Sequence, residues 1–191
     1  MVNFLIFGPP GSGKGTQSVK LAEKFNLLHL STGDMLRAEI AAGTELGKKM
    51  STIMSKGELV PDSVVIEMIA NKIDGSKGIA GFLFDGFPRT VAQTVALEEM
   101  LNTRGMKIDC MLALDVEHDE LVKRLIGRAE VSGRADDMDP AVIENRIDVY
   151  NEKTAPIMNY CEERGVYQPV NGMGSIDDIF GRLVEVMNKI V

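Results

Sequence analysis

Long apolar runs are missing from this sequence of 191 residues. A membrane-spanning helix needs roughly 18 to 20 consecutive apolar residues, and no stretch approaches that length. The apolar N-terminal segment, residues 2–7, is too short for a signal peptide and has no basic residues before it. We therefore expect a cytoplasmic protein that has no membrane partner.

Cysteine is also scarce. The sequence has 2 cysteines, Cys110 and Cys161, and neither belongs to a paired motif. A disulfide framework or a zinc site would need closely spaced pairs. We expect two reduced thiols in the core and no zinc.

Positive charge is in short supply, with 21 Lys and Arg against 28 Asp and Glu and a net charge of −7. Proteins that bind nucleic acid non-specifically do so through an excess of basic residues, so nucleic acid is not an expected partner. The sequence contains no internal repeat, low-complexity tract or linker, and its length fits one domain.

Short apolar runs alternate with segments of helical period along the whole chain. This alternation predicts an α/β fold in which helices cover both faces of a parallel sheet. The last segment predicts a helix after Ser175, because its apolar residues recur at steps of three and four. The predicted strands are Val2–Phe7, Leu27–Leu30, Phe82–Asp85, Cys110–Val116 and Val166–Val170.

A glycine-rich loop, Gly8–Thr16, follows the first predicted strand and precedes a predicted helix. This context is the one that a phosphate-binding loop requires, because its backbone N–H groups and the helix N-terminus converge on an anion. Lys14 would add a full charge at the β- and γ-phosphates. The hydroxyl residue that commonly follows this lysine and binds Mg²⁺ is replaced by Gly15, with Thr16 one position later.

Polar residues follow two other predicted strands. Ser31-Thr32-Gly33-Asp34 can cap a helix that carries Arg37, or it can contact a ligand, since ligands bind at the carboxyl ends of parallel strands. Asp85 ends the third strand and leads into a turn that contains Arg89. That aspartate resembles the carboxylate that orients Mg²⁺ or its water in nucleotidases. The other interpretation is an ordinary Gly/Pro turn.

Four other charged residues and two histidines remain to be interpreted. Arg124 and Arg128 share one face of a predicted helix, which is either a solvated face or a phosphate contact. Asp136 and Asp137 can cap the following helix, which Pro156 should kink or end. His29 and His118 have no evident partners and are expected to be structural.

Two predicted helices between residues 44 and 74 meet near Pro61, which suits a first helical turn. They form either a mobile flap or a plain helical crossover. Within the second, Asn71-Lys72-Ile73-Asp74 matches the guanine-reading motif of GTPase switches, and residues 64–70 can be interpreted as a strand. The order of motifs argues against a switch, because no D-x-x-G lies between Thr16 and Asn71 and residue 15 is glycine.

Four motifs together resemble those of the adenylate kinase family, in its order and spacing and over essentially the whole chain. They are Gly8–Thr16, Ser31–Arg37, Asp85–Arg89 and Ser132–Asp137. The resemblance implies a P-loop three-layer sandwich, with a five-stranded parallel sheet and helices on both faces. The single nucleotide kinase domain would comprise a core (1–30, 61–127 and 138–191), a helical flap that binds the nucleoside monophosphate (31–60) and a short lid (128–137).

The resemblance also implies roles for individual residues. The ATP site would include Gly11, Ser12, Gly13, Lys14, Gly15, Thr16, Arg128 and Gly174. The AMP site would include Thr32, Arg37, Glu58, Leu59, Val60, Gly86, Phe87, Pro88, Arg89, Gln93, Arg134 and Arg146. Charge stabilisation during transfer would come from Lys14, Arg89, Arg124, Arg128, Arg134 and Arg146, and Asp85 would orient Mg²⁺ through water.

The implied activity is that of an ATP:AMP phosphotransferase. The enzyme, expected to be a monomer, would transfer the terminal phosphoryl group of MgATP to AMP in line and reversibly, giving two ADP and maintaining adenine nucleotide balance. A UMP/CMP kinase of the same fold is the nearest alternative. Thr32 and Gln93 favour AMP, because the pyrimidine enzymes tend toward Ala and Asn there.

Overall fold

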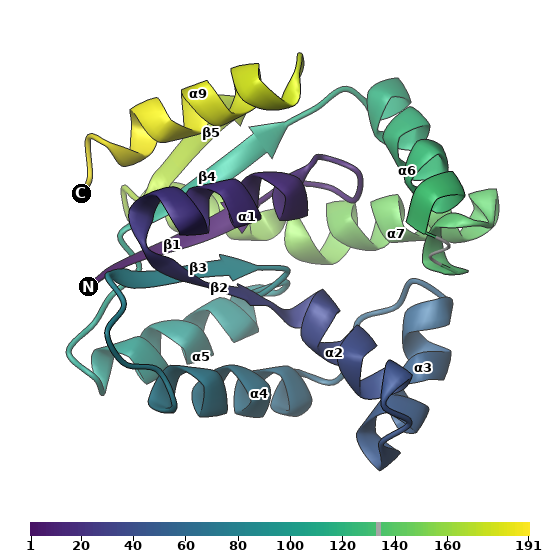
Figure 1. Cartoon of the computed structure of the whole chain (residues 1–191), viewed down its shortest axis with the longest axis horizontal. Helices are drawn as coiled ribbons and strands as arrows, with labels where there is room; N and C mark the ends of the chain where they lie inside the picture. The colour runs from purple at the N-terminus through teal and green to yellow at the C-terminus, as the bar shows by residue number, and fades with distance from the viewer. Residues whose placement is uncertain (133–134) are drawn as a thin grey trace.

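The computed structural model describes residues 1–132 and 135–191 of the chain. Within this part, five parallel strands form one sheet in the order β2-β3-β1-β4-β5 (Figure 1). Every predicted strand is present, and no end differs from the prediction by more than one residue. The predicted fold class is therefore confirmed. The strands are β1 (Val2–Phe7), β2 (Leu27–Ser31), β3 (Gly81–Asp85), β4 (Cys110–Asp115) and β5 (Tyr167–Asn171).

Both faces of the sheet are covered by helices (Figure 1). Alternate residues of β1 point to opposite faces, as the two-residue period of a strand requires. Phe4 and Ile6 join one buried cluster, and Leu5 and Phe7 join another. The first cluster is closed by α1 (Lys14–Phe25) and α9 (Ile176–Met187), and the second by α4 (Asp62–Asp74), α5 (Val91–Asn102) and α8 (Pro156–Glu163).

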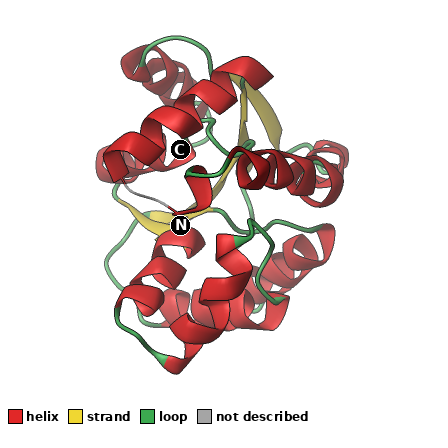
Figure 2. Cartoon of the chain, turned by 90° about the vertical axis from the view of Figure 1, so that its right-hand side faces the viewer, coloured by secondary structure: helices red, strands yellow, loops and turns green. Residues whose placement is uncertain are grey.

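The other helices lie beyond the carboxyl ends of the strands, on the right of Figure 1, and Figure 2 looks onto this edge. From β1 the chain passes to β2 and β3 on one side and later to β4 and β5 on the other. Ligands bind at such a topological switch point in open α/β sheets. The helices at this edge are α2 (Thr32–Ala41), α3 (Glu45–Ser55), α6 (His118–Ser132), the short 3₁₀ helix η1 (Ala135–Asp137), α7 (Pro140–Val149) and the π-helix η2 (Tyr150–Thr154).

Several helix ends follow the sequence prediction. The Ser31 hydroxyl accepts a hydrogen bond from the Asp34 amide at the start of α2, and Ser175 forms a reciprocal capping box with Asp178 at the start of α9. The segment that begins with α7 ends before Pro156, which starts α8. The proposed capping role of Asp136 and Asp137 is wrong. The cap of α7 is Asp139, whose carboxylate accepts from the Ala141 amide at 2.8 Å.

Two interpretations of residues 44–74 need correction. Pro61 does not lie in the first turn of α4 but precedes it as the N-cap residue. Residues 64–70 are helical, so the strand that a guanine-reading motif would follow is absent there. Asn71–Asp74 forms the last turn of α4 and does not line the cavities described below. Among the described residues, no helix is both long enough and apolar enough to cross a membrane.

Candidate active site

The glycine-rich loop leaves β1 at the carboxyl edge and enters α1. Gly11 and Gly13 have φ angles of 85° and 92°, a left-handed backbone that residues with a Cβ rarely adopt. A Cβ on Gly11 would also lie 2.7 Å from the carbonyl oxygen of Leu121. Gly13 supplies no side-chain cap for α1. The first N–H groups of the helix therefore remain available for an anion.

Lys14 closes over this loop. Its Nζ donates hydrogen bonds to the carbonyl oxygens of Gly8 at 2.7 Å and Pro9 at 3.0 Å. Burial lowers the pKa of Lys14 to about 8; the charge of Asp85 opposes the shift, and the nearby Arg89 reinforces it. A phosphate chain would supply the negative charge that the buried ammonium lacks.

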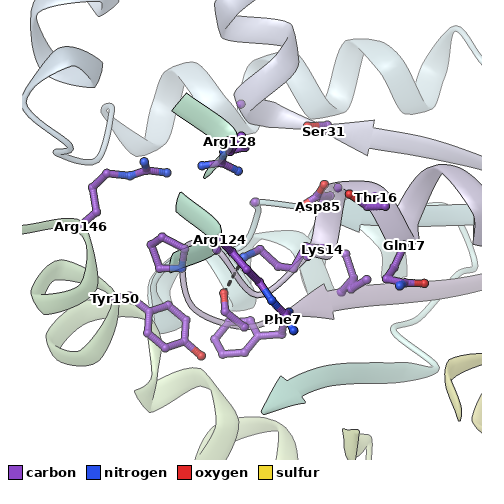
Figure 3. Close-up of a pocket in the computed structure, with 18 of the residues that line it drawn as sticks. Phe7, Lys14, Thr16, Gln17, Ser31, Asp85, Arg124, Arg128, Arg146 and Tyr150 are labelled. Carbon is purple, nitrogen blue, oxygen red and sulfur yellow. Dashed lines mark hydrogen bonds between the residues drawn. The ribbon is translucent and has the colours of Figure 1, made fainter. Parts of the chain in front are cut away.

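A cavity of about 910 Å³ opens above the loop at the carboxyl edge of the sheet. Its walls come from the loop, the ends of β2 and β3, and helices α6, α7 and α9 (Figure 3). A smaller pocket of about 70 Å³ shares Gly33, Arg37, Leu59 and Arg89 with it. The described residues thus form two adjoining compartments, a large one on the phosphate loop and a small one beneath α2.

Arg89 lies where the two compartments meet, and its position is fixed by several hydrogen bonds. Its Nε donates to the carbonyl oxygen of Gly86 at 2.8 Å, and its backbone amide donates to Oε1 of Gln93 at 2.7 Å. Gln93 is 2 % exposed, and its Nε2 donates to Asp62 at 2.6 Å. Thr32 donates to the same Gly86 oxygen at 2.8 Å. Burial lowers the pKa of Arg89, and the nearby charge of Arg146 lowers it further.

Two further arginines meet at the carboxylate of Asp137, whose side chain is 0 % exposed. Arg128, on α6, donates from Nε at 2.6 Å and from Nη2 at 2.8 Å. Arg146, on α7, bonds the same carboxylate and lies 3.0 Å from that of Asp136. Burial opposes ionisation, but the hydrogen bonds and charges of both arginines outweigh it and hold the pKa of Asp137 below its ordinary value. Asp137 therefore holds Arg128 and Arg146, both of which line the large cavity (Figure 3).

Arg124 occupies a different part of the cavity from Arg128. Its Nε donates to Glu120 at 2.7 Å and its Nη2 donates to the Gly172 carbonyl at 3.1 Å. Gln17 bonds the first residue of α9, because its Nε2 donates to the Ile176 carbonyl oxygen at 2.9 Å. The helix face shared by Arg124 and Arg128 is therefore not simply solvated, because both side chains line the cavity.

Asp85 lies at the floor of the cavity and is 7 % exposed. His29 Nε2 lies 3.2 Å from its Oδ2, so the expectation that this histidine has no partner is wrong. A Cβ built on Gly15 would lie 3.8 Å from the same oxygen, so the carboxylate faces the phosphate loop. The described residues contain no group of three or more His, Cys, Asp or Glu placed to bind a metal ion. One carboxylate beside a phosphate site fits Mg²⁺ held mainly by phosphates and water.

Most of the residues suggested by the resemblance line one of the two compartments, with three exceptions. The side chains of Ser12 and Phe87 are buried, at 0 % and 2 % exposure, and neither residue lines a cavity. Arg134 lies outside the described residues. The residues that do line a compartment include Gly11, Gly13, Gly15, Thr16, Thr32, Arg37, Glu58, Leu59, Val60, Gly86, Pro88 and Gly174.

Sequence reasoning missed four polar residues that support the site: Gln17, His29, Asp62 and Thr154. Each bonds a residue distant in sequence, by between 31 and 159 positions. No local spacing could identify such partners. For His29, the order of the strands would have been enough to identify the partner. β2, which carries His29, pairs with β3 so that its last residue, Ser31, lies beside Asp85.

Comparisons with known proteins agree with this geometry. Residues 6–166 match the family model described as adenylate kinase. The chain is 49 % identical over 190 residues to an adenylate kinase of Parabacteroides distasonis, with 100 % of both chains covered. It is 48 % identical over 190 residues to that of Flavobacterium psychrophilum, again with 100 % of both covered. For the adenylate kinase of Phenylobacterium zucineum, identity is 49 % over 178 residues and 93 % of both chains.

Proposed function

The chain belongs to the adenylate kinase family, and we propose that it transfers the terminal phosphoryl group of ATP to AMP, giving two ADP. The observation that supports this most is the pair of adjoining compartments with Arg89 between them. The large one, on the phosphate loop, suits a triphosphate donor. The small one, under α2, suits a monophosphate acceptor.

In the proposed reaction, a phosphate oxygen of AMP attacks the γ-phosphorus of ATP while the bond from that phosphorus to the β,γ-bridging oxygen breaks. The acceptor needs no general base, because the second pKa of a phosphate monoester is about 6 and the group is ionised at neutral pH. The remaining requirements are position and positive charge around the moving group. We propose that Lys14, Arg89, Arg128 and Arg146 provide them, together with Arg134.

Each compartment has its own set of proposed contacts. On the donor side, the amides of Gly11–Thr16 hold the phosphates, and Arg124 orients the turn that carries Gly174 against the base. On the acceptor side, Arg37 and Arg89 hold the AMP phosphate. Its base lies against Thr32, the backbone of residues 58–60 and Gln93.

Mg²⁺, when bound with ATP, would neutralise charge on the β- and γ-phosphates. Asp85 would hold its water, and His29 would fix the orientation of the carboxylate. Gly15 leaves the space next to that carboxylate open. This arrangement suits a metal that arrives with the substrate.

Closure of the flap (31–60) and the lid (128–137) would exclude water, which is the competing acceptor. The flap already contacts α7 here, because Asn145 Nδ2 donates to the Lys56 carbonyl at 2.8 Å. We further propose a monomer that acts in the cytoplasm on free nucleotides, without nucleic acid or membrane partners. Light scattering at assay concentration tests the first of these proposals.

One experiment tests the function directly. The protein is incubated with MgATP and each nucleoside monophosphate in turn, and diphosphate formation is measured. We expect rapid formation of ADP with AMP and much slower reaction with CMP or UMP. Preference for a pyrimidine monophosphate would make it a UMP/CMP kinase, and strong GTP preference with slow single-turnover hydrolysis would indicate a switch.

A further inference from the structure

The backbone of Arg89 is held on both sides by distant side chains. Its amide donates to Gln93, as described above, and its carbonyl oxygen accepts a hydrogen bond from Oγ1 of Thr154 at 2.9 Å. Thr154 lies 65 positions further along the chain and is 6 % exposed, at the wall of the large cavity. The peptide units on either side of Arg89 therefore cannot rotate without breaking a buried hydrogen bond.

Thr154 ends a π-helical segment, η2, between α7 and α8. The Ala155 amide donates to the Tyr150 carbonyl at 2.8 Å, a step of five residues in place of four. π-Helical turns insert one residue into a helix and are frequent at functional sites. The ring of Tyr150 packs 5.6 Å from that of Phe7, at the end of β1, and so fixes this segment to the sheet.

The extra residue matters because Arg146 and Thr154 lie eight positions apart. In an unbroken α-helix, at about 100° per residue, Thr154 would point about 80° away from the face of Arg146. With one residue absorbed by the π-turn, the offset falls to about 20°. The π-turn thus brings both residues to one side of the helix, and both line the large cavity.

We propose that Thr154 is a positioning residue, which fixes Arg89 for the acceptor phosphate and couples it through η2 to Arg146. The two arginines are close enough for the charge of Arg146 to lower the pKa of Arg89. Two like charges stay close only where other contacts hold them, as Asp136 and Asp137 hold Arg146. This proposal rests on the proposed function, because it assigns the acceptor phosphate to Arg89.

The competing explanation is that the hydroxyl only satisfies a buried carbonyl and contributes to stability. Thr94 provides a matched control, since it is 0 % exposed and its hydroxyl donates to the carbonyl of Thr90, the N-cap residue of α5, at 3.0 Å. Thr154→Val and Thr94→Val each remove one buried hydroxyl and keep the size of the side chain. Thr154→Ser keeps the donor, and Thr154→Cys replaces it with a weak donor.

The experiment measures kcat and KM for AMP and for ATP, together with the melting temperature, for all four variants and the unmodified protein. We expect Thr154→Val to lower kcat/KM for AMP about tenfold to a hundredfold, the range caused by small displacements of a catalytic group. KM for ATP should change by less than about twofold, because the phosphate loop is untouched. Thr154→Ser should recover most of the activity, and Thr154→Cys should be intermediate and cover the case in which the valine variant does not fold.

The proposal is overturned if Thr154→Val loses no more kcat/KM for AMP than Thr94→Val does. It is also overturned if Thr154→Val raises KM for AMP and KM for ATP by the same factor. Failure of serine to restore activity would overturn it too. An unmodified protein that forms no ADP from AMP would overturn the proposed function and this inference together. If the unmodified protein is active and Thr154→Val has the same kcat/KM for AMP, only the inference is overturned.

Discussion

The proposed donor and acceptor sides of the cavity are built by different means. The donor side is a contiguous loop, Gly8–Thr16, in which backbone amides and one lysine face the site. The proposed acceptor side consists of residues from α2, the turn after β3, α5, α7 and η2. Side chains of α2, α5 and η2 hydrogen-bond the backbone of that turn, and Arg146 of α7 bonds Asp137. A loop of this kind depends on local backbone geometry, whereas the acceptor side depends on tertiary packing. The two sides should therefore respond differently to substitution.

The largest expected effect is a loss of activity toward AMP without a loss of stability. Arg89→Ala removes a charge from the junction of the compartments, and an arginine at a transferring phosphoryl group contributes about 10³ to 10⁵ in rate. We expect kcat/KM for AMP to fall about a thousandfold. The melting temperature should hold or rise, because burial and Arg146 already disfavour the Arg89 charge.

Arg104→Ala is the matched control for Arg89→Ala. Arg104 forms an ion pair with Asp74 at 2.8 Å outside the cavity, and Asp74 is 60 % exposed. The control should retain activity within about twofold and lose little stability, as exposed ion pairs contribute little. Near-normal turnover by Arg89→Ala would remove Arg89 from the proposed mechanism.

Asp137→Asn tests whether Arg128 and Arg146 need a negatively charged partner. Asparagine has nearly the same shape but cannot balance the charges of Arg128 and Arg146. We expect kcat to fall about thirtyfold and stability at pH 7 to fall by about 1 to 2 kcal/mol, the range for hydrogen bonds to charged groups reduced for partial exposure of Arg128. Asp139→Asn, at the cap of α7, is the control, because asparagine also caps helices.

The same variant has a defined pH signature. In the folded protein the pKa of Asp137 lies below its ordinary value of 3.8. The ionised carboxylate therefore contributes stability above pH 3.8, and this contribution is lost as the pH falls below that value. Urea unfolding of the two proteins should therefore converge toward acid pH. A constant difference between pH 7 and pH 3 would contradict the proposed charge pairing.

The contrast between the two sides also explains what could be predicted from the sequence. The strands were found because buried parallel strands appear as short apolar runs, and the loop because its chemistry is contiguous. The capping role suggested for Asp137 was wrong, because negative charge near a helix start is also compatible with a buried ion pair. Its burial depends on α6 packing against α7 through Leu125, Ile143 and Ile147. The His29–Asp85 and Thr154–Arg89 contacts likewise follow from strand order and a π-turn, which no local pattern indicates.

A pH titration sharpens the comparison further, because Lys14 can lose its proton near neutrality while the arginines cannot. The pKa of Lys14 is about 8 in the free protein, and bound ATP should raise it. ATP binding then requires proton uptake above pH 8, so the Kd of ATP should rise by up to about tenfold between pH 7 and 9. KM for AMP should not change over the same pH range. Calorimetry in buffers of different ionisation enthalpy measures the proton uptake.

Lys14→Met is the control for the titration. Because the folded pKa lies below the ordinary 10.5, the unfolded chain holds more protons between pH 8 and 10.5. The Lys14 contribution to stability should therefore rise with pH in that window, and the methionine variant should lack this slope. A Kd for ATP that does not change from pH 7 to 9 in the unmodified protein would show that the lysine stays charged.

The smallest expected effect concerns the choice of acceptor base. Gln93 spans from the Arg89 amide to the Asp62 carboxylate, and asparagine, which is one methylene shorter, cannot reach both. We expect Gln93→Asn to raise KM for AMP about fivefold, the cost of about one hydrogen bond, and to narrow the preference for AMP over CMP. KM for ATP should not change. If the ratio of AMP to CMP turnover stayed constant while both fell, Gln93 would act only by holding Arg89, and the base would be selected by the flap.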